Sequence, residues 1–271
     1  MSNKLASSFS PGDQAITKKS EDKLYVKARV VDKIFNFISN DQINSLTVAI
    51  TGEWGSGKTS AMNLLANALN ESHNNVVLTF EPLLEGRFGV TEVLELFYLK
   101  LYAALSKKNP EVDSIFKKLL GSLGAIVFTG TKLSIDIPTI GEAGIDFGEK
   151  YQKILDIWKK HDVKSFQQQT AQLNEFLQNK KLKIFIFIDE IDRLPPEHII
   201  SFLMFARILE TFENLICIVG VDYDQVIQSL MASSTYSLNS YERAKSYIDK
   251  LFHAQFHIHH NQSILASLLI I

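Results

Sequence analysis

The residues best suited to chemistry form one glycine-rich run, which reads Gly52, Glu53, Trp54, Gly55, Ser56, Gly57, Lys58 and Thr59 and matches G-x-x-x-x-G-K-[ST]. Phosphate oxygens carry dense negative charge, and glycines let a loop turn its backbone N–H groups inward around them. Lys58 can reach the β- and γ-phosphates, and Thr59 supplies a hydroxyl ligand for Mg²⁺. The run therefore predicts a site for the phosphates of a nucleotide.

The sequence on both sides supports this interpretation. An apolar strand is predicted over residues 46–51, just before the glycines, and a helix over residues 60–70, just after them. A helix that starts near Lys58 aims its unpaired N–H groups and the positive end of its dipole at the same anion. Ser60 belongs to this predicted site. A glycine-rich turn with an incidental lysine is the alternative, which the strand and the helix disfavour.

A second group of residues follows the apolar strand predicted over residues 184–188, which ends in Asp189 and Glu190. The carboxyl ends of parallel strands line the ligand crevice, so Asp189 is expected beside Thr59, where it would hold Mg²⁺ directly or through water. Glu190 is expected to polarise the water that attacks the γ-phosphate. An acidic pair that only starts a turn is the alternative, which the complete glycine-rich motif disfavours.

Asp222 is a third candidate, because it follows the strand predicted over residues 215–220. If that strand lies between the strand before the glycines and the strand before Asp189, Asp222 points at the γ-phosphate as a sensor. The alternative is an N-cap for the helix predicted over residues 223–231, and the two roles are compatible.

These residues have to be positioned by alternating strands and helices. Strand character appears over residues 46–51, 76–80, 184–188, 215–220 and 252–258, and the first four are continuous apolar runs typical of strands buried on both faces. Helical patterns are predicted from Asp22 onward and over residues 60–70, 91–107, 166–178 and 198–212. The alternation predicts an α/β, doubly wound, mostly parallel sheet of order 5-1-4-3-2 by strand number.

One large domain is expected over residues 21–271, after a flexible polar arm over residues 1–20. About residues 82–164 form an insertion between the two motifs. Its apolar stripe over residues 93–105 and the run LLGSLGAIVF exceed the needs of one amphipathic face. We therefore predict an interaction arm for self-association or a protein effector, with ordinary core that caps the sheet as the alternative.

Composition narrows the classes of function. Of the 271 residues, 46% are hydrophobic and the net charge is −2, so the chain is globular and lacks the basic surface of a nucleic-acid binder. A single cysteine, Cys217, and an N-terminus without a signal peptide predict a cytoplasmic protein. The longest apolar run, residues 119–131, is too short to span a membrane, which favours a buried element or an interfacial loop.

The chain resembles the KAP family of P-loop NTPases, of the additional-strand, catalytic-glutamate class. The resemblance rests on four stretches: AITGEWGSGKTS, IFIFIDEIDRLPPEHI, LICIVGVDYDQVIQSL and YIDKLFHAQFHI. The second resembles the family's I-D-[DE]-L-D-R-x-x-P block and carries over Asp189, Glu190, Asp192, Arg193 and Pro196. The fourth carries over Tyr247, Lys250 and Phe252.

The resemblance implies a Mg²⁺-dependent ATPase, and ATP rather than GTP, in a nucleotide-driven regulatory or defence role in bacteria. The expected catalytic residues are Lys58, Glu190, Asp222 and Arg193. Arg193 and Arg207 are the two candidates for an arginine that stabilises the transition state, and an ordinary surface position is the stronger interpretation of Arg207. A non-hydrolysing, nucleotide-gated scaffold is the alternative function.

The sequence also departs from the family. It reads TFEPLLEGRFG after the second strand, where relatives carry an Asn-Ala-Trp-like segment. It ends at Ile271, so the helical lid of relatives is expected to be missing or truncated, with a short closing helix as the alternative. Trp54 is expected to pack against the sheet or to cover the phosphates. The late histidines are expected on a solvated strand face rather than on a metal: His253, His257, His259 and His260.

Overall fold

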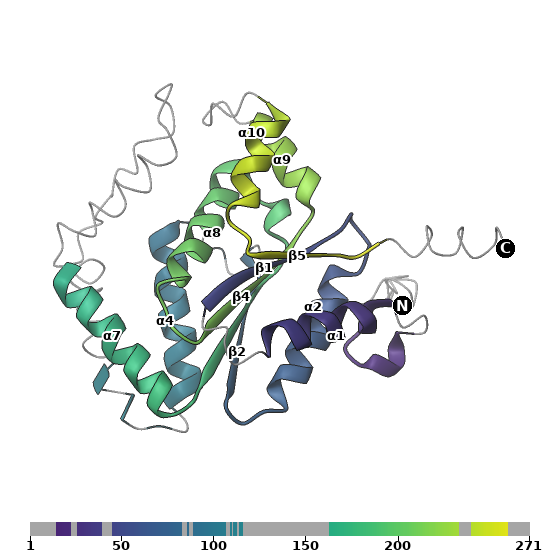
Figure 1. Ribbon diagram of the computed structural model, residues 1–271. Coiled ribbons are helices and arrows are strands. Elements are labelled where there is room, and N and C mark those ends of the chain that lie inside the picture. Colours follow the sequence, from purple (N-terminus) through teal and green to yellow (C-terminus); the bar gives the residue numbers. More distant parts are fainter. Residues whose placement is uncertain are drawn as a thin grey trace, which may run out of the picture.

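The computed structural model describes residues 15–22, 26–39, 45–82, 86, 89–106, 109, 111–112, 114–115, 163–232 and 240–259. Its centre is a five-stranded sheet made of β1 (Ser45–Thr51), β2 (Asn75–Phe80), β3 (Lys183–Ile188), β4 (Leu215–Val221) and β5 (Ala254–His257). All four neighbouring pairs are parallel, and the order is β2-β3-β4-β1-β5. Read from the other edge, this is the predicted order 5-1-4-3-2, and the predicted α/β fold is confirmed (Figure 1).

The burial of each strand follows from its place in the sheet. Strands β1, β3 and β4 are buried almost throughout, which agrees with their continuous apolar sequences. The same prediction was wrong for β2. Its first three residues are only half-buried and Thr79 is exposed, because β2 forms an edge of the sheet. The short strand β5 forms the other edge and alternates between half-buried and exposed residues.

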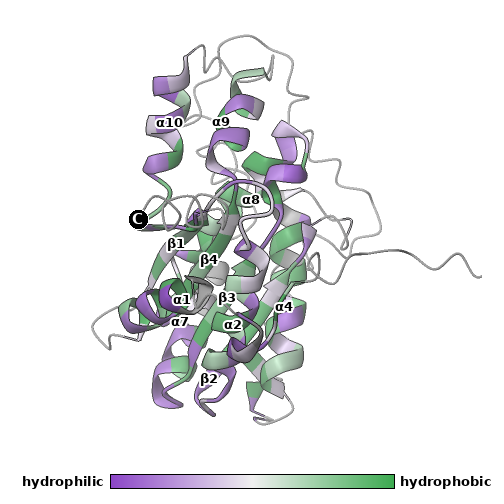
Figure 2. Cartoon of the chain, turned by 90° about the vertical axis from the view of Figure 1, so that its right-hand side faces the viewer, coloured by the Kyte–Doolittle hydropathy of each residue, from purple (hydrophilic) through white to green (hydrophobic). Residues whose placement is uncertain are grey.

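Helices cover both faces of the sheet. One face carries α1 (Val26–Ile38) and α2 (Lys58–Asn70), and the other carries α4 (Val90–Ser106), α7 (Val163–Asn179) and α8 (Pro196–Leu209) (Figure 1). Alternate strand residues serve the two faces. Phe185 and Phe187 join α1 and α2, whereas Ile184 and Ile186 join the opposite layer. Figure 2 shows the result, with hydrophobic strands in the middle and hydrophilic stretches on the outer helices.

Two further helices lie between β4 and β5 in the chain. Helix α9 (Tyr223–Ala232) follows β4, and α10 (Tyr241–Asp249) precedes β5. The two helices pack side by side, and their apolar residues, including Val226 and Ile248, belong to the same core cluster as α4 and α8. The sequence predicted α9 over nearly the same residues. It did not predict α10.

Helix α4 corrects the interpretation of the insertion as an exposed arm. The stripe over residues 93–105 is core, because Val93, Leu94, Phe97, Tyr98, Leu101 and Leu105 are all at most 2% exposed. They pack against β2 and α8 rather than facing a partner. The alternative, ordinary core that caps the sheet, is therefore correct for α4. The run LLGSLGAIVF and the rest of residues 116–162 lie outside the described residues.

Residues 15–20, predicted as part of a flexible arm, are held against the domain. The backbone N–H of Ile16 donates to Ser60 Oγ at 3.1 Å, and Asn67 Nδ2 donates to the carbonyl oxygen of Thr17 at 2.9 Å. Lys19 also forms an ion pair with Asp32 of α1 at 2.7 Å. Residues 1–14 and 260–271, with the predicted ends of the arm and of the lid, lie outside the described residues. Among the helices that the structure describes, none is long and apolar enough to cross a bilayer.

Candidate functional site

The glycine-rich run is a loop that joins the end of β1 to the start of α2. Gly55 and Gly57 have φ values of 76° and 99°, in the left-handed region that strains residues with a Cβ. These two glycines let the backbone turn sharply, and the loop leads directly into α2, which begins at Lys58. The first N–H groups of a helix have no acceptor within the helix, so those of α2 are available to an anion held by the loop.

Three polar side chains of this loop and helix differ in their hydrogen-bond partners. Lys58 Nζ donates to the carbonyl oxygens of Gly52 and Glu53 at 2.9 and 3.2 Å, which leaves one of its three protons for a ligand. The hydroxyl of Ser56 is buried without a hydrogen-bond partner among the described residues. The hydroxyl of Ser60 accepts from Ile16, so Ser60 offers its backbone N–H rather than its side chain.

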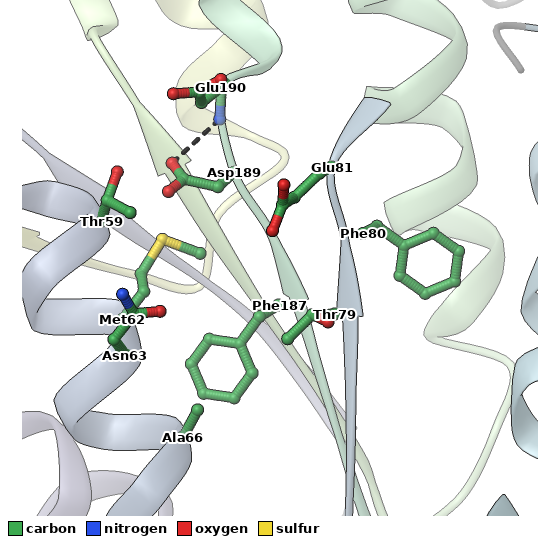
Figure 3. Close-up of a pocket in the computed structure, with 10 residues that line it drawn as sticks. All are labelled: Thr59, Met62, Asn63, Ala66, Thr79, Phe80, Glu81, Phe187, Asp189 and Glu190. Carbon is green, nitrogen blue, oxygen red and sulfur yellow. Dashed lines mark hydrogen bonds between the residues drawn. The ribbon is translucent and has the colours of Figure 1, made fainter. Parts of the chain in front are cut away.

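A cavity of about 120 Å³ lies between α2 and the ends of β2 and β3 (Figure 3). Its polar end carries Thr59 from α2, Glu81 after β2, and Asp189 and Glu190 after β3, and its remaining lining is Met62, Asn63, Ala66, Thr79, Phe80 and Phe187. Figure 3 shows the carboxylate of Asp189 pointing from the end of β3 toward Thr59. The structure thus brings together the hydroxyl and the carboxylate that the sequence predicted as metal ligands. Hydroxyl and carboxylate oxygens are ligands that suit a hard cation such as Mg²⁺.

The two carboxylates after β3 are held differently. Asp189 Oδ1 accepts a hydrogen bond from the backbone N–H of Glu190 at 2.9 Å. Glu190 has a φ of 60°, in the left-handed region, and its Oε1 forms an ion pair with Arg193 Nη1 at 2.6 Å. Burial raises the pKa of Glu190, and the positive charge of Arg193 acts in the opposite direction. Glu190 therefore has a raised pKa, as suits a proton acceptor, but its carboxylate is paired with the Arg193 guanidinium.

The short 3-10 helix η2 (Ile191–Arg193) follows this strand end, and its last residue contacts the glycine-rich loop. The Arg193 guanidinium lies over the ring of Trp54, with 4.0 Å between its central carbon and the ring centre. Trp54 is 60% exposed, so the prediction that it packs against the sheet was wrong. Asp192 is only 4% exposed. Burial raises the pKa of Asp192, and the nearby charge of Lys58 acts against that rise.

Asp222 lies where the topology predicted, because β4 sits between β1 and β3. Its Oδ1 accepts from the backbone N–H of Gln225 at 3.2 Å, so the side chain caps α9. The predicted N-cap is confirmed, and the sensor role stays a prediction. Arg207 is a surface residue of α8 in an ion pair with Glu210 at 2.8 Å.

His253 and His257 contact residues of the neighbouring strand β1. The backbone N–H of Thr47 donates to His253 Nδ1 at 3.0 Å, and Thr51 Oγ1 lies 3.1 Å from His257 Nδ1. Both side chains are exposed, as expected for a solvated face. Within the described ranges, no group of three or more His, Cys, Asp or Glu residues is arranged to hold a metal ion. His260 lies outside those ranges.

Sequence reasoning missed Glu81, which lines the cavity beside Glu190. The signal was present, because Glu81 directly follows a predicted strand, as Asp189 does. It also occupies the place where the sequence departs from the family's Asn-Ala-Trp-like segment. The packing residues Met62 and Gly220 were missed too, since nothing in a local pattern shows that they lie against Asp189.

Comparison with solved structures gives a weak likeness. The ORC2 protein of Aeropyrum pernix, solved in ADPNP and ADP complexes, matches with a TM-score of 0.36 and 8% identity over 86% of this chain. The match covers 46% of that protein, so the chain spans less than half of its length. A likeness at this level carries no argument about function. No curated protein matches the chain.

Comparison with protein families gives a direct assignment. A family model described as the KAP family P-loop domain matches residues 28–269, which include the glycine-rich loop, the acidic strand end, Asp222 and the sheet that holds them. The chain therefore belongs to the KAP family of P-loop NTPases, a family of nucleotide-binding domains.

Proposed function

We propose that this domain binds ATP with Mg²⁺ in the Gly52–Thr59 loop and hydrolyses the γ-phosphate. The observation that carries the proposal is the meeting of Thr59 and Asp189, from two separate elements, in one cavity beside the loop. If the loop were only a structural turn, nothing would explain why a hydroxyl and a carboxylate from two different elements line the same cavity beside it. ATP rather than GTP is proposed from the family resemblance.

The binding roles follow from the donors in the loop. Residues 52–57 and the first turn of α2, including Ser60, would supply N–H groups to the phosphates. Lys58 would supply a positive charge. Thr59 and Asp189 would hold Mg²⁺, which neutralises phosphate charge when it is bound.

The hydrolytic roles belong to residues that follow β3 and β4. Glu190 would accept the proton of the attacking water, for which its position at a strand end and its raised pKa are suited. Arg193 would contact the γ-phosphate as its charge develops, and Asp222 would sense the same phosphate from the end of β4.

Phosphate release tests hydrolysis separately from binding. We expect Glu190→Gln to keep nucleotide affinity and to lose turnover by about 10²-fold or more, because the amide cannot accept a proton. Glu242→Gln, on the exposed side of α10, is the matched control and should release phosphate at the wild-type rate. If Glu190→Gln also keeps the wild-type rate, Glu190 is not the base.

One observation favours a second function, a nucleotide-gated scaffold that binds ATP without cycling. The carboxylate of Glu190 is already paired with Arg193, and a base in that state cannot act until the pair opens. Tight binding of ATP without phosphate release, with or without a partner protein, would select this function over hydrolysis.

The proposal extends to the cellular setting. The single cysteine, Cys217, is buried in β4 and free, which fits a reducing compartment such as the cytoplasm. A regulatory or defence role in bacteria rests on the family resemblance alone. Self-association or an effector contact, if it uses the insertion, would have to involve surfaces other than the buried stripe of α4.

A further inference from the structure

Arg193 joins the two halves of the site through two different contacts. The central carbon of its guanidinium lies over the ring of Trp54 in the glycine-rich loop, 4.0 Å from the ring centre, a separation that suits stacking of the two flat groups. Its Nη1 lies 2.6 Å from Oε1 of Glu190, at the end of β3. The loop and the acidic strand end are far apart in sequence and contribute different roles to the proposed function. Arg193 is in direct contact with both.

The two contacts use different parts of the guanidinium and do not compete. Stacking on an aromatic ring engages the flat face, whereas hydrogen bonds and ion pairs use the N–H groups in the plane. A guanidinium has five such N–H groups, so it can change partners in the plane while it stays on the ring. Trp54 belongs to the glycine-rich loop and is exposed.

We infer that Trp54 is a positioning residue that holds the Arg193 guanidinium within reach of both Glu190 and a bound triphosphate. In the structure Arg193 pairs with Glu190, so the carboxylate is engaged by the guanidinium. When a triphosphate fills the loop, Arg193 turns in its own plane to the γ-phosphate, and Glu190 becomes free to accept a proton. The inference rests on the proposed function, because it assumes that Glu190 is the base.

The direction of this exchange follows from charge. Glu190 offers one negative charge, shared between two oxygens and partly open to solvent, since its side chain is 31% exposed. A γ-phosphate offers more charge on three oxygens and matches the N–H fork of an arginine. Arg193 should therefore bind the phosphate in preference to the Glu190 carboxylate. The ring keeps the guanidinium from leaving the site during the exchange.

Fluorescence can report the exchange directly. The chain has two tryptophans, so a Trp158→Phe protein carries Trp54 as its single reporter. We expect MgATP to change the Trp54 emission, because the stacked guanidinium reorients when it leaves Glu190. In the same background, Arg193→Lys keeps the charge but loses the flat stacking group and the N–H fork. It should bind MgATP and show less than about half of that emission change.

Kinetics separate positioning from a merely structural role. We expect Trp54→Leu to lower kcat by about tenfold while KM changes by less than about threefold, because the lost stack misplaces Arg193 rather than the nucleotide. Trp54→Tyr restores a ring that stacks and should recover most of kcat. Phe37→Leu removes another exposed ring, 38% exposed on α1 away from the cavity, and should leave kcat unchanged.

The failure of this inference differs from the failure of the proposed function. If wild-type protein hydrolyses ATP while Trp54→Leu keeps the wild-type kcat and Trp54 emission ignores MgATP, the inference is overturned and the ATPase stands. Equal loss of kcat in Trp54→Leu and Trp54→Tyr also overturns it, since stacking would then be irrelevant. If wild-type protein binds no MgATP, both proposals fail together.

Discussion

Gly220, near the end of β4, lies directly against the carboxylate of Asp189. A Cβ added at Gly220 would sit 2.5 Å from Asp189 Oδ1 and 2.5 Å from the sulfur of Met62. Both distances are shorter than any ordinary contact with a Cβ. The absence of a side chain at position 220 therefore leaves the space in which the Asp189 carboxylate turns toward Thr59. A glycine in a buried strand thus shapes the proposed metal site on the neighbouring strand.

We therefore expect Gly220→Ala to displace Asp189 and to weaken Mg²⁺-dependent nucleotide binding by about tenfold, the lower end of the loss seen when the surroundings of a metal ligand are changed. The added methyl also overpacks the strand and should cost about 1–3 kcal/mol of unfolding free energy. Nucleotide affinity measured with Mg²⁺ and with EDTA separates the two effects, because only the metal-dependent part depends on Asp189. Affinity that falls equally in both conditions would show general damage instead and would argue against the metal role of Asp189.

Phe97 tests whether α4 is part of the core. Its side chain is fully buried, and its ring lies 5.9 Å from that of Phe205 and 5.5 Å from that of Phe212, centre to centre. We expect Phe97→Ala to lower the unfolding free energy by about 3–5 kcal/mol, measured by urea denaturation. Leu99→Ala, two residues along the same helix and 42% exposed, should change it by less than about 0.5 kcal/mol. Equal effects at the two positions would mean that α4 does not pack as described.

Asp249 links three elements near the edge strand β5. Its carboxylate accepts hydrogen bonds from the hydroxyl of Tyr223, from Lys245 Nζ at 2.8 Å and from Gln255 Nε2 at 3.1 Å. Its hydrogen bonds with Lys245 and then Tyr223 lower the pKa of Asp249. A carboxylate whose pKa is lower in the folded state stabilises the fold above its unfolded pKa, and this stabilisation is lost as the pH falls through the folded pKa.

We expect Asp249→Asn to lower the unfolding free energy at neutral pH by about 1 kcal/mol, the scale of a partly exposed hydrogen bond. The difference from the wild type should shrink as the pH falls from about 4 toward the lower folded pKa of Asp249, because the unfolded wild type binds the proton first. Urea denaturation of both proteins at neutral pH and at about pH 3 measures this. A difference that stays constant over that interval would contradict the role of the charge.

The sheet was predictable because each buried strand has an apolar sequence that can be recognised without knowing its neighbours. Buried parallel strands such as β3 and β4 have continuous apolar sequences, so their bounds could be predicted to within one or two residues. The positions of Thr59 and Asp189 followed from two motifs and from the rule that strand ends share an edge. The half-exposed state of β2 could not be predicted, because an apolar sequence does not show which strand lies at an edge.

The rest depended on contacts between distant residues. The apolar excess of α4 fits an exposed arm or a helix packed against β2 and α8, and sequence alone does not separate these. The stack of Arg193 on Trp54 and the approach of Gly220 to Asp189 join residues on different elements. No local pattern encodes such pairs. Glu81 was missed because a single glutamate after a strand is most often an ordinary turn residue.

Equilibrium binding of a fluorescent ATP analogue with Mg²⁺, to wild-type protein and to Lys58→Ala, tests the central claim most directly. Lys58 is the one cation within the glycine-rich loop motif, and its loss should weaken binding by at least about tenfold, because a charge-assisted contact to phosphate disappears. Lys180→Ala removes a surface lysine, 43% exposed and paired with Glu111, and should bind like the wild type. Equal affinity of all three proteins for the analogue would contradict the account.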